Sequence, residues 1–305
     1  MRVPDPRVTE RRNPRTQDID LADPAGIVDL MIAEDRTVPE AVASQRDRIA
    51  EAISAAENTF RNGGRLFYVG AGTSGRLGVL DASECPPTFG TDPEMVQGII
   101  AGGPPALTRS QEGAEDNLHQ ARVDLAGRGI RKGDMVVGIA ASGTTPYVRI
   151  ALEYARGVGA RTAIVACSPP PAETLQWVDI PIVAVTGPEV ITGSTRLKAG
   201  TATKLILNMI TTGAMIRLGK TFGNLMIDLR ATNDKLVDRS QRIVAEVCRV
   251  SRDDARELLE RANGSVKLAI VMNALGLSRE DAERRLTEQG GVVRRVIGGA
   301  PPPVE

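Results

Sequence analysis

Two short loops rich in glycine and hydroxyl side chains are the clearest candidates for chemistry in this sequence. Residues 70–75 read Gly-Ala-Gly-Thr-Ser-Gly, and residues 142–146 read Ser-Gly-Thr-Thr-Pro. Serine and threonine most often serve as helix caps, but two such loops favour a ligand, because backbone N–H groups and hydroxyls at a helix N-terminus suit a phosphate. The predicted phosphate-binding residues are Gly72, Thr73, Ser74, Ser142, Gly143, Thr144 and Thr145.

The first loop also matches GxGxxG, the fingerprint of dinucleotide-binding folds. That interpretation requires an acidic residue about 20 positions further on, at the end of the next strand. The strand expected at residues 95–100 is followed by Ala-Gly-Gly, and Glu94 lies before it. Neither loop ends in the Gly-Lys-Ser/Thr of a nucleotide P-loop. The sequence therefore argues against NAD and ATP, and we expect no cofactor.

Short apolar segments alternate with helical ones in the middle of the chain, which predicts a parallel sheet covered on both faces. The fold class is therefore α/β: a three-layer αβα domain with a five-stranded, flavodoxin-like parallel sheet and its ligand at the carboxyl ends of the strands. The expected strands are 65–69, 95–100, 134–140, 161–166 and 180–185, and the expected helices are 112–126, 146–158 and 198–218.

The chain on the N-terminal side of this domain is expected to be an arm followed by helices. Within residues 1–60, we interpret the polar, arginine-rich stretch 1–22 as an extended arm. Helices follow from Pro24, with Asp23 as the N-cap. The sugar-phosphate-binding domain itself is expected at residues 61–230.

Residues 235–298 lack strand patterns and predict a small C-terminal domain of three helices. Ser251 and Ser278 each stand three residues before an aspartate, which is the spacing of N-terminal capping. The expected core residues of this domain are Leu258, Leu259, Ala262, Ile270, Leu275, Leu277, Leu286 and Val293.

The composition excludes several classes of partner. The 305 residues include 38 Lys+Arg and 38 Asp+Glu, with 3% aromatic residues, which does not favour binding of nucleic acid or of an anionic membrane. Three scattered cysteines and one histidine, His119, argue against a metal site or a disulfide framework. The most apolar stretch, 205–218, is too short and polar to span a membrane. We expect a cytoplasmic protein without a secretory signal.

Four longer blocks carry a resemblance to a known family: residues 9–14, 80–90, 112–116 and 193–204. Together with the two loops, they resemble the sugar isomerase (SIS) domain family and, within it, the N-acetylmuramic acid 6-phosphate etherases. The resemblance covers roughly residues 8–298, with the blocks in the expected order.

The resemblance implies an SIS domain, a small helical domain, a homodimer and no metal or cofactor. The implied activity converts N-acetylmuramic acid 6-phosphate and water to N-acetylglucosamine 6-phosphate and D-lactate, as in recycling of cell-wall sugars. By carry-over, Glu84 is the proton donor and Glu115 the second catalytic carboxylate. Lys198, at the start of an expected helix, would neutralise the phosphate or the substrate carboxylate; a surface lysine without a role is an equal alternative.

Elimination is the chemistry that two carboxyl groups can perform on such a substrate. The aldehyde of the open-chain sugar acidifies the C2 proton, and the lactyl ether is on C3. We hypothesise that Glu115 removes this proton and that Glu84 protonates the ether oxygen and later activates water. If the helix from Ser74 to Glu84 is unbroken, about 15 Å separates its ends. Either the helix breaks early or the catalytic glutamate comes from the partner subunit, and we favour a site at or near a dimer interface.

Three alternatives use the same domain type. An aldose–ketose isomerase also needs a base near C2, but the block at 80–90 favours the etherase. A non-catalytic sugar-phosphate regulator would be expected to have tandem SIS domains and a longer chain. A transcriptional regulator would need a helix-turn-helix with a basic face, which residues 23–61 lack. The expected helix 112–126 would place His119 on the same face as Glu115, where we interpret it as a partly exposed residue.

Overall fold

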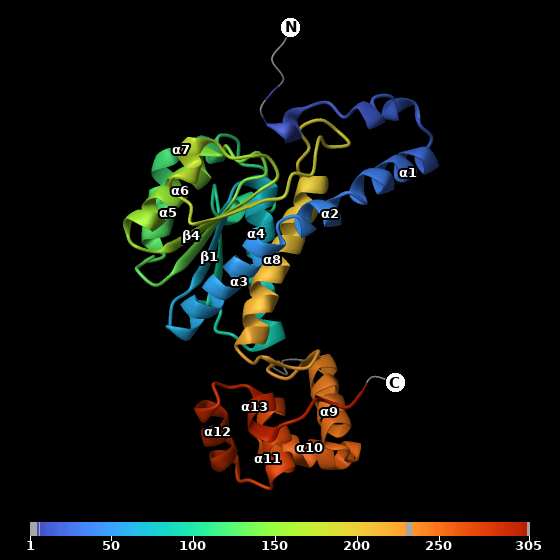
Figure 1. The fold of residues 1–305 in the computed structure, drawn as a ribbon, viewed down its shortest axis with the longest axis vertical. Coiled ribbons are helices and arrows are strands. Elements are labelled where there is room, and N and C mark those ends of the chain that lie inside the picture. The colour runs from blue at the N-terminus through green and yellow to red at the C-terminus, as the bar shows by residue number, and fades with distance from the viewer. Residues whose placement is uncertain (1–4, 6, 230–233, 304–305) are drawn as a thin grey trace. The chain divides into compact units, whose positions relative to one another are not determined.

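The structure is a computed structural model that describes residue 5, residues 7–229 and residues 234–303. The chain folds into two compact units. Figure 1 shows the fold with each residue coloured by its position along the chain. The first comprises Met1–Ser83 and Glu94–Thr211, and the second comprises Glu84–Pro93 and Thr212–Glu305. Among the described residues, no helix has the length and apolar character needed to cross a membrane.

A five-stranded parallel sheet forms the centre of the first unit. Its order is β2-β1-β3-β4-β5, the 2-1-3-4-5 order of flavodoxin-like folds. The strands are almost entirely buried, as expected when helices cover both faces, and the fold-class prediction is confirmed. Their bounds are β1 Leu66–Gly70, β2 Val96–Ile100, β3 Met135–Ile139, β4 Arg161–Ala166 and β5 Ile180–Val183.

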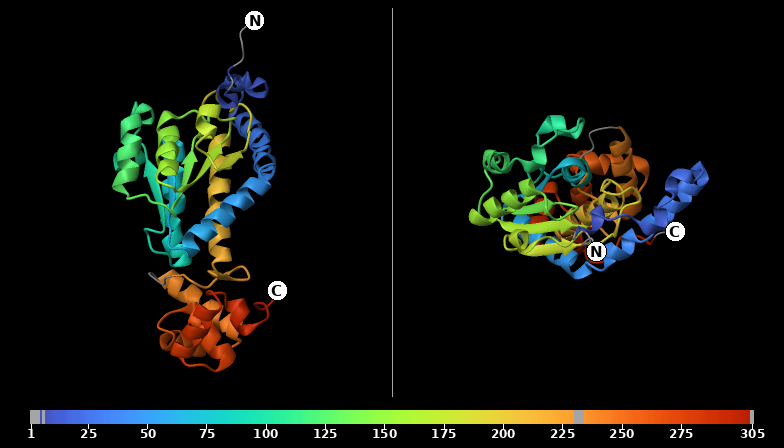
Figure 2. Two further views of the ribbon diagram at one scale, coloured as in Figure 1. Left: turned by 60° about the vertical axis from the view of Figure 1, so that its left-hand side comes forward. Right: turned by 90° about the horizontal axis from the view of Figure 1, so that it is seen from above.

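Helices cover both faces of this sheet (Figures 1 and 2). On one face, α5 (Leu118–Gly127) and α6 (Pro146–Gly157) pack against a core that includes Phe67 and Val136. The other face carries α3 (Arg46–Arg61), α4 (Gly72–Phe89) and α8 (Lys198–Arg217). There a side chain at Gly78 of α4 would collide with Tyr68, whose hydroxyl donates to the Leu207 carbonyl of α8 at 3.4 Å. A short helix, α7 (Ala172–Leu175), lies between β4 and β5 in the chain.

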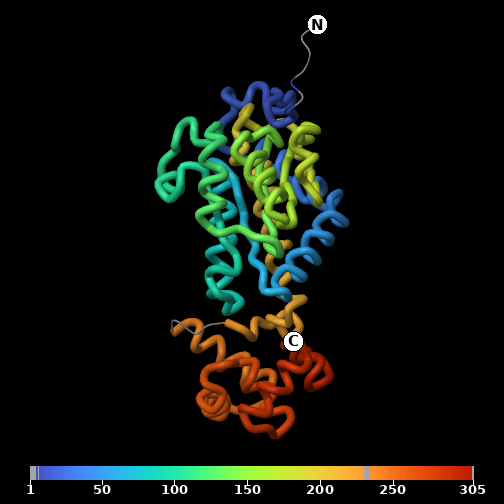
Figure 3. Tube along the Cα trace, turned by 90° about the vertical axis from the view of Figure 1, so that its left-hand side faces the viewer, coloured from blue at the N-terminus to red at the C-terminus, as the bar shows by residue number. Residues whose placement is uncertain are grey.

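The N-terminal segment differs from the extended arm that the sequence predicts. Val8–Glu10, Pro14–Thr16 and Ile19–Leu21 form 3₁₀ helices, followed by α1 (Pro24–Asp35) and α2 (Val38–Ala43). The segment is tied to loops of the same unit, and Figure 3 shows it beside them: the Thr9 amide donates to Ser168 Oγ at 3.3 Å, and Thr16 Oγ1 donates to the Val190 carbonyl at 2.9 Å. These long-range bonds, which no local pattern predicts, order the segment.

Residues 234–303 of the second unit form five helices, so the prediction of three helices for residues 235–298 is wrong. Both predicted caps are present: Ser251 and Ser278 accept hydrogen bonds from the amides three residues on. Seven of the eight predicted core residues are buried or packed against the core, but Leu275 is 42% exposed. The elements are α9 Asp234–Cys248, α10 Arg252–Arg261, α11 Val266–Leu275, α12 Arg279–Glu288, α13 Val293–Ile297, and a hairpin of β6 Thr221–Phe222 and β7 Leu225–Met226.

Candidate functional site

A polar cavity of about 540 Å³ lies at the carboxyl edge of the sheet in the first unit. It is lined by residues from the loops after β1 and β3, which are adjacent parallel strands. The two hydroxyl-rich loops therefore converge on one space, as a shared phosphate would require. The predicted site residues that line it are Gly72, Thr73, Ser74, Glu115, Ser142, Thr144 and Thr145.

The first loop brings the start of α4 against the sheet. A Cβ at Gly75 would lie 2.6 Å from Ile100 and 2.7 Å from the Gly70 carbonyl, so glycine allows helix and strand to touch. The first helical bond runs from the Gly75 amide to Ala71. The amides of residues 72–74 precede it and have no partner within the helix. These donors, with the Thr73 and Ser74 hydroxyls, are available to an anion in the cavity.

The second loop is a tight turn before α6. Gly143 has φ +75°, and a Cβ there would lie 2.9 Å from Pro170 Cα, which excludes larger residues. Ser142 Oγ and Thr144 Oγ1 are 2.9 Å apart. Thr145 occupies the N-cap of α6, yet its side chain makes no capping hydrogen bond. The simple helix-cap interpretation therefore does not account for Thr145.

Glu115 lines the same cavity and is exposed, but the helix expected around it is not formed. It lies in a 3₁₀ turn, Ala114–Asp116, and α5 begins only after Asn117, whose side chain caps the new helix by accepting from the Gln120 amide at 3.0 Å. His119 lies on α5, is exposed and does not line the cavity. The predicted shared helix face of Glu115 and His119 is therefore wrong.

Glu84 is exposed on α4 and does not line this cavity. The helix α4 continues beyond Glu84, through Pro86 and Pro87, to Phe89. Both prolines lie near the end of the helix. The Gly90 amide, just beyond the last helical residue, donates to the Pro86 carbonyl at 2.9 Å. An unbroken α4 separates Ser74 and Glu84 by about 15 Å along its axis.

Lys198 is neither a surface lysine nor part of the cavity lining. Its side chain is fully buried, and its Nζ lies 2.7 Å from Glu34 Oε2. Arg15 also binds Glu34, and these hydrogen bonds, that from Arg15 foremost, lower the pKa of Glu34 to about 2. Glu189 accepts from the Lys198 and Ala199 amides at 2.9 Å, although its burial raises its pKa. This buried network fixes the start of α8.

Four polar side chains of the lining were not predicted from the sequence: Arg7, Glu10, Asp116 and Thr195. Glu10 lies over Gly193, where a Cβ would be 3.2 Å from Glu10 Oε2. Glu10, Asp116 and Thr195 fall inside blocks that carry the family resemblance, which was the available signal. Arg7 and Glu10 reach the loops through the fold of the N-terminal segment, which is not visible in local patterns.

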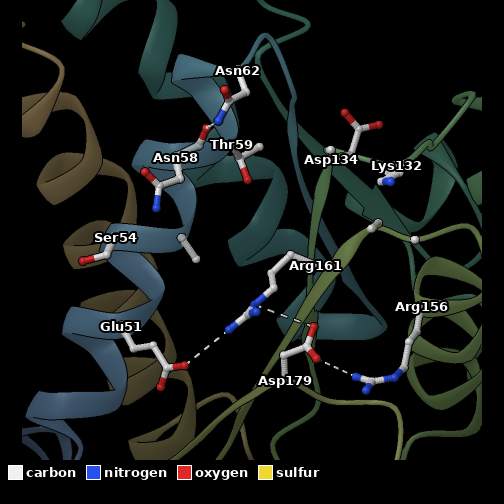
Figure 4. Close-up of a pocket in the computed structure, with 14 residues that line it drawn as sticks. Glu51, Ser54, Asn58, Thr59, Asn62, Lys132, Asp134, Arg156, Arg161 and Asp179 are labelled. Atoms are coloured by element: carbon white, nitrogen blue, oxygen red, sulfur yellow. Dashed lines mark hydrogen bonds and ion pairs between the residues drawn. The ribbon is translucent and has the colours of Figure 1, made fainter.

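A second, larger cavity of about 730 Å³ lies at the opposite edge of the sheet (Figure 4). Four of its charged side chains pair with one another. Arg161 lies 3.4 Å from Glu51 and 3.7 Å from Asp179, and Arg156 lies 2.6 Å from Asp179. These pairs connect α3, β4 and α6, so we interpret this cavity as structural. Among the described residues, no group of three or more His, Cys, Asp or Glu side chains is placed to hold a metal ion.

Comparison with known proteins extends these observations. Residues 48–156 match the glucokinase regulatory protein N-terminal SIS domain, and residues 223–268 match the C-terminal lid domain of glucokinase regulatory protein. Among solved structures, a phosphoheptose isomerase from Francisella tularensis aligns with a TM-score of 0.46 and 16% identity, covering 62% of this chain and 98% of that chain.

Curated relatives match nearly the whole chain. A protein of Parasynechococcus marenigrum is 53% identical over 95% of this chain and 92% of its own length, and one of Mycolicibacterium smegmatis is 50% identical over 95% and 97%. Both are named N-acetylmuramic acid 6-phosphate etherase. Identity at this level over this length shows that the chain belongs to the N-acetylmuramic acid 6-phosphate etherases.

Proposed function

We propose that the chain cleaves the lactyl ether of N-acetylmuramic acid 6-phosphate, giving N-acetylglucosamine 6-phosphate and D-lactate, as a carbon–oxygen lyase. The observation that carries the proposal is the shared cavity in which two hydroxyl-rich helix starts face the carboxylate of Glu115. Membership of the etherase family supplies the substrate. The phosphate is held by the loops, and the sugar carbons extend toward Glu115.

The reaction proceeds by elimination and then hydration. The C1 aldehyde of the open-chain sugar makes the C2 proton acidic, and Glu115 removes it. Expulsion of lactate from C3 then leaves an unsaturated aldehyde, to which water adds at C3. Each half-reaction needs one group that accepts a proton and one that donates it, which is the task of a positioned pair of carboxyl groups. In this assignment, Glu84 protonates the leaving ether oxygen and then activates the water.

The second carboxyl group comes from a partner subunit in this proposal. The cavity does not include Glu84 of its own chain, and α4 carries that residue about 15 Å along the helix from Ser74. The helix α1 supports a homodimer, because Glu34 alone among its twelve described residues is buried. Its Ile27, Val28 and Ile32 are 36%, 54% and 45% exposed, an apolar face that a second copy of the chain would cover.

We also infer a cytoplasmic location and a role in recycling or scavenging of cell-wall sugar. The cysteines Cys85, Cys167 and Cys248 are thiols and not members of disulfides, which fits a reducing compartment. A phosphorylated sugar is a substrate that cells retain inside the membrane, which is consistent with the same location.

One assay tests the proposed reaction. The purified chain is incubated with N-acetylmuramic acid 6-phosphate without added metal or nucleotide, and D-lactate is measured; a ketose product without lactate would indicate an isomerase instead. Run in deuterated water, the assay also tests the roles. Glu115→Gln should abolish solvent exchange at C2. If Glu115→Gln still exchanges C2 at the normal rate while Glu84→Gln does not, the roles are reversed.

Subunit mixing tests the shared site. Glu84→Gln and Glu115→Gln chains are each assayed alone and then after unfolding and refolding together, since Glu115 lines the cavity with the loops of its own chain. If each site combines the loops of one chain with Glu84 of the other, a mixed dimer contains one site free of both changes, so activity returns on mixing. Mixed dimers that form without any recovery would contradict the shared site.

A further inference from the structure

The side chains that line the site cavity carry more negative than positive charge, although the proposed substrate is itself an anion. Among the described residues that line it, Arg7 carries the only positive charge, whereas Glu10, Glu115 and Asp116 are acidic. The proposed substrate, however, carries two anions: the phosphate on C6 and the carboxylate of the lactyl group on C3. The loops provide neutral donors for one anion, which leaves the other without an assigned partner.

The fold holds Arg7 firmly at this cavity. Arg7 immediately precedes the 3₁₀ turn Val8–Glu10, and its carbonyl accepts from the Glu10 amide at 3.1 Å. Thr9 is fully buried, and its amide donates to Ser168 Oγ in the loop after β4. The backbone next to Arg7 is thus anchored at the carboxyl edge of the sheet.

Arg7 already binds a carboxylate. Its Nε donates to Asp5 Oδ1 at 3.0 Å, and its Nη2 donates to Asp5 Oδ2 at 2.7 Å, the two-pronged geometry in which guanidinium groups recognise carboxylates. The two side chains are 44% and 33% exposed. Exposed pairs of this kind contribute little to stability, so a ligand carboxylate can take the place of Asp5 at small cost.

We propose that Arg7 binds the lactyl carboxylate of the substrate in place of Asp5, while the loops hold the phosphate. The inference rests on the proposed function and deepens it by naming the residue that distinguishes a lactyl ether from a plain sugar phosphate. Arg7 orients the group that leaves from C3, next to the carbon whose proton Glu115 removes. A sugar phosphate without the lactyl group gains nothing from Arg7.

The test separates the two anions by using two ligands. N-Acetylmuramic acid 6-phosphate has both anions, and N-acetylglucosamine 6-phosphate has the phosphate alone. The KM for the first and the inhibition constant for the second are measured for the wild-type chain, Arg7→Gln and Arg7→Lys. Arg46→Gln is the matched control, since Arg46 has an 86% exposed side chain in the same unit and does not line the cavity.

Arg7→Gln should raise the KM about 10- to 100-fold, the effect of losing a charged hydrogen-bonding partner, and leave the inhibition constant nearly unchanged. The KM of Arg7→Lys should lie between those of the wild-type chain and Arg7→Gln, because lysine keeps the charge but not the two-pronged geometry. An inhibition constant that rises together with the KM assigns Arg7 to the phosphate and overturns the proposal, as does an unchanged KM. A wild-type chain that releases no D-lactate would refute the proposed function itself.

Discussion

The two edges of the central sheet both carry polar cavities, and they differ in how their charges are used. At the amino edge, the cavity of about 730 Å³ is lined by Arg156, Arg161, Glu51 and Asp179, which neutralise one another through ion pairs. At the carboxyl edge, the smaller cavity of about 540 Å³ presents two helix starts with their hydroxyls, and the exposed carboxylate of Glu115. Polar groups left available to a ligand therefore indicate the site better than volume does.

The difference follows from the geometry of a parallel sheet. Each helix that follows a strand begins at the carboxyl edge, so its free amides gather there. At the amino edge, strands begin after turns, and buried charges are satisfied by the fold itself: Asp134 is buried and pairs with Arg65 at 2.7 Å. Substitutions in the cavity at the carboxyl edge should therefore lower catalysis, whereas substitutions in the cavity at the amino edge should lower stability.

The largest contrast is expected between two carboxylates. Glu115→Gln should lower kcat by about 10²–10⁴-fold, because it removes the proposed general base, with little change in melting temperature, since Glu115 is exposed. Asp179→Asn should do the reverse: its carboxylate accepts from the Thr162 amide at 2.9 Å and pairs with Arg156, so stability falls while kcat is retained. Steady-state kinetics and thermal unfolding of both variants check this. A folded Asp179→Asn variant without activity would break the comparison.

Two ion pairs give the next contrast, measured by urea unfolding. Lys198→Met should destabilise the chain by about 3 kcal/mol, because removing one member of a buried pair leaves a charge without its partner; Glu34 keeps Arg15, which limits the loss. Arg161→Met removes ion pairs with Glu51 and Asp179, but the Arg161 side chain is 49% exposed, so the change should cost at most about 1 kcal/mol. Equal losses would show that burial does not decide what these ion pairs contribute.

Two serines, one at each edge of the sheet, test the comparison through the KM. Ser142→Ala should raise the KM about 10-fold, because a hydroxyl that donates to the phosphate is lost. Ser54 lines the cavity at the amino edge, and its Oγ donates to the Ala50 carbonyl at 3.0 Å. Ser54→Ala should leave the KM unchanged. A KM that responds to Ser54→Ala and not to Ser142→Ala would move the site to the other edge.

The smallest expected effect concerns Asp5. Asp5→Asn should lower the KM about two- to fivefold, because the exposed pair with Arg7 no longer competes with the substrate carboxylate. Asp20→Asn, which removes an exposed acid elsewhere on the N-terminal segment, is the control. The same KM measurement decides the role of Asp5: an increase would mean that Asp5 orients Arg7 instead of competing for it.

Much of the first unit could be predicted because its signals are local. Alternating apolar and helical segments give the parallel sheet, and glycine with hydroxyls after a strand gives the two loops, whose residues Ser74 and Thr144 share one cavity. The capping serines Ser251 and Ser278 were likewise predictable, because a cap acts over three residues.

The remaining features depend on contacts between distant parts of the chain. Lys198 resembles any lysine at a helix start until Glu34, 164 residues away, is placed beside it. Arg7 and Glu10 reach the cavity only because bonds such as that of Thr9 to Ser168, 159 residues apart, wind the N-terminal segment onto the sheet edge. Glu115 lies in a turn rather than a helix because Asn117 starts a new helix.

The N-terminal segment contributes to the cavity but not to the hydrophobic core beneath α5 and α6. Glu10 lines the cavity, and the segment is attached through bonds such as that of the Thr9 amide to Ser168, whereas the core cluster contains none of its residues. Proteolysis within residues 8–22 would therefore change the cavity while much of the sheet remained folded. Circular dichroism alone would not detect such damage, so the intact mass should be confirmed before Michaelis constants are compared.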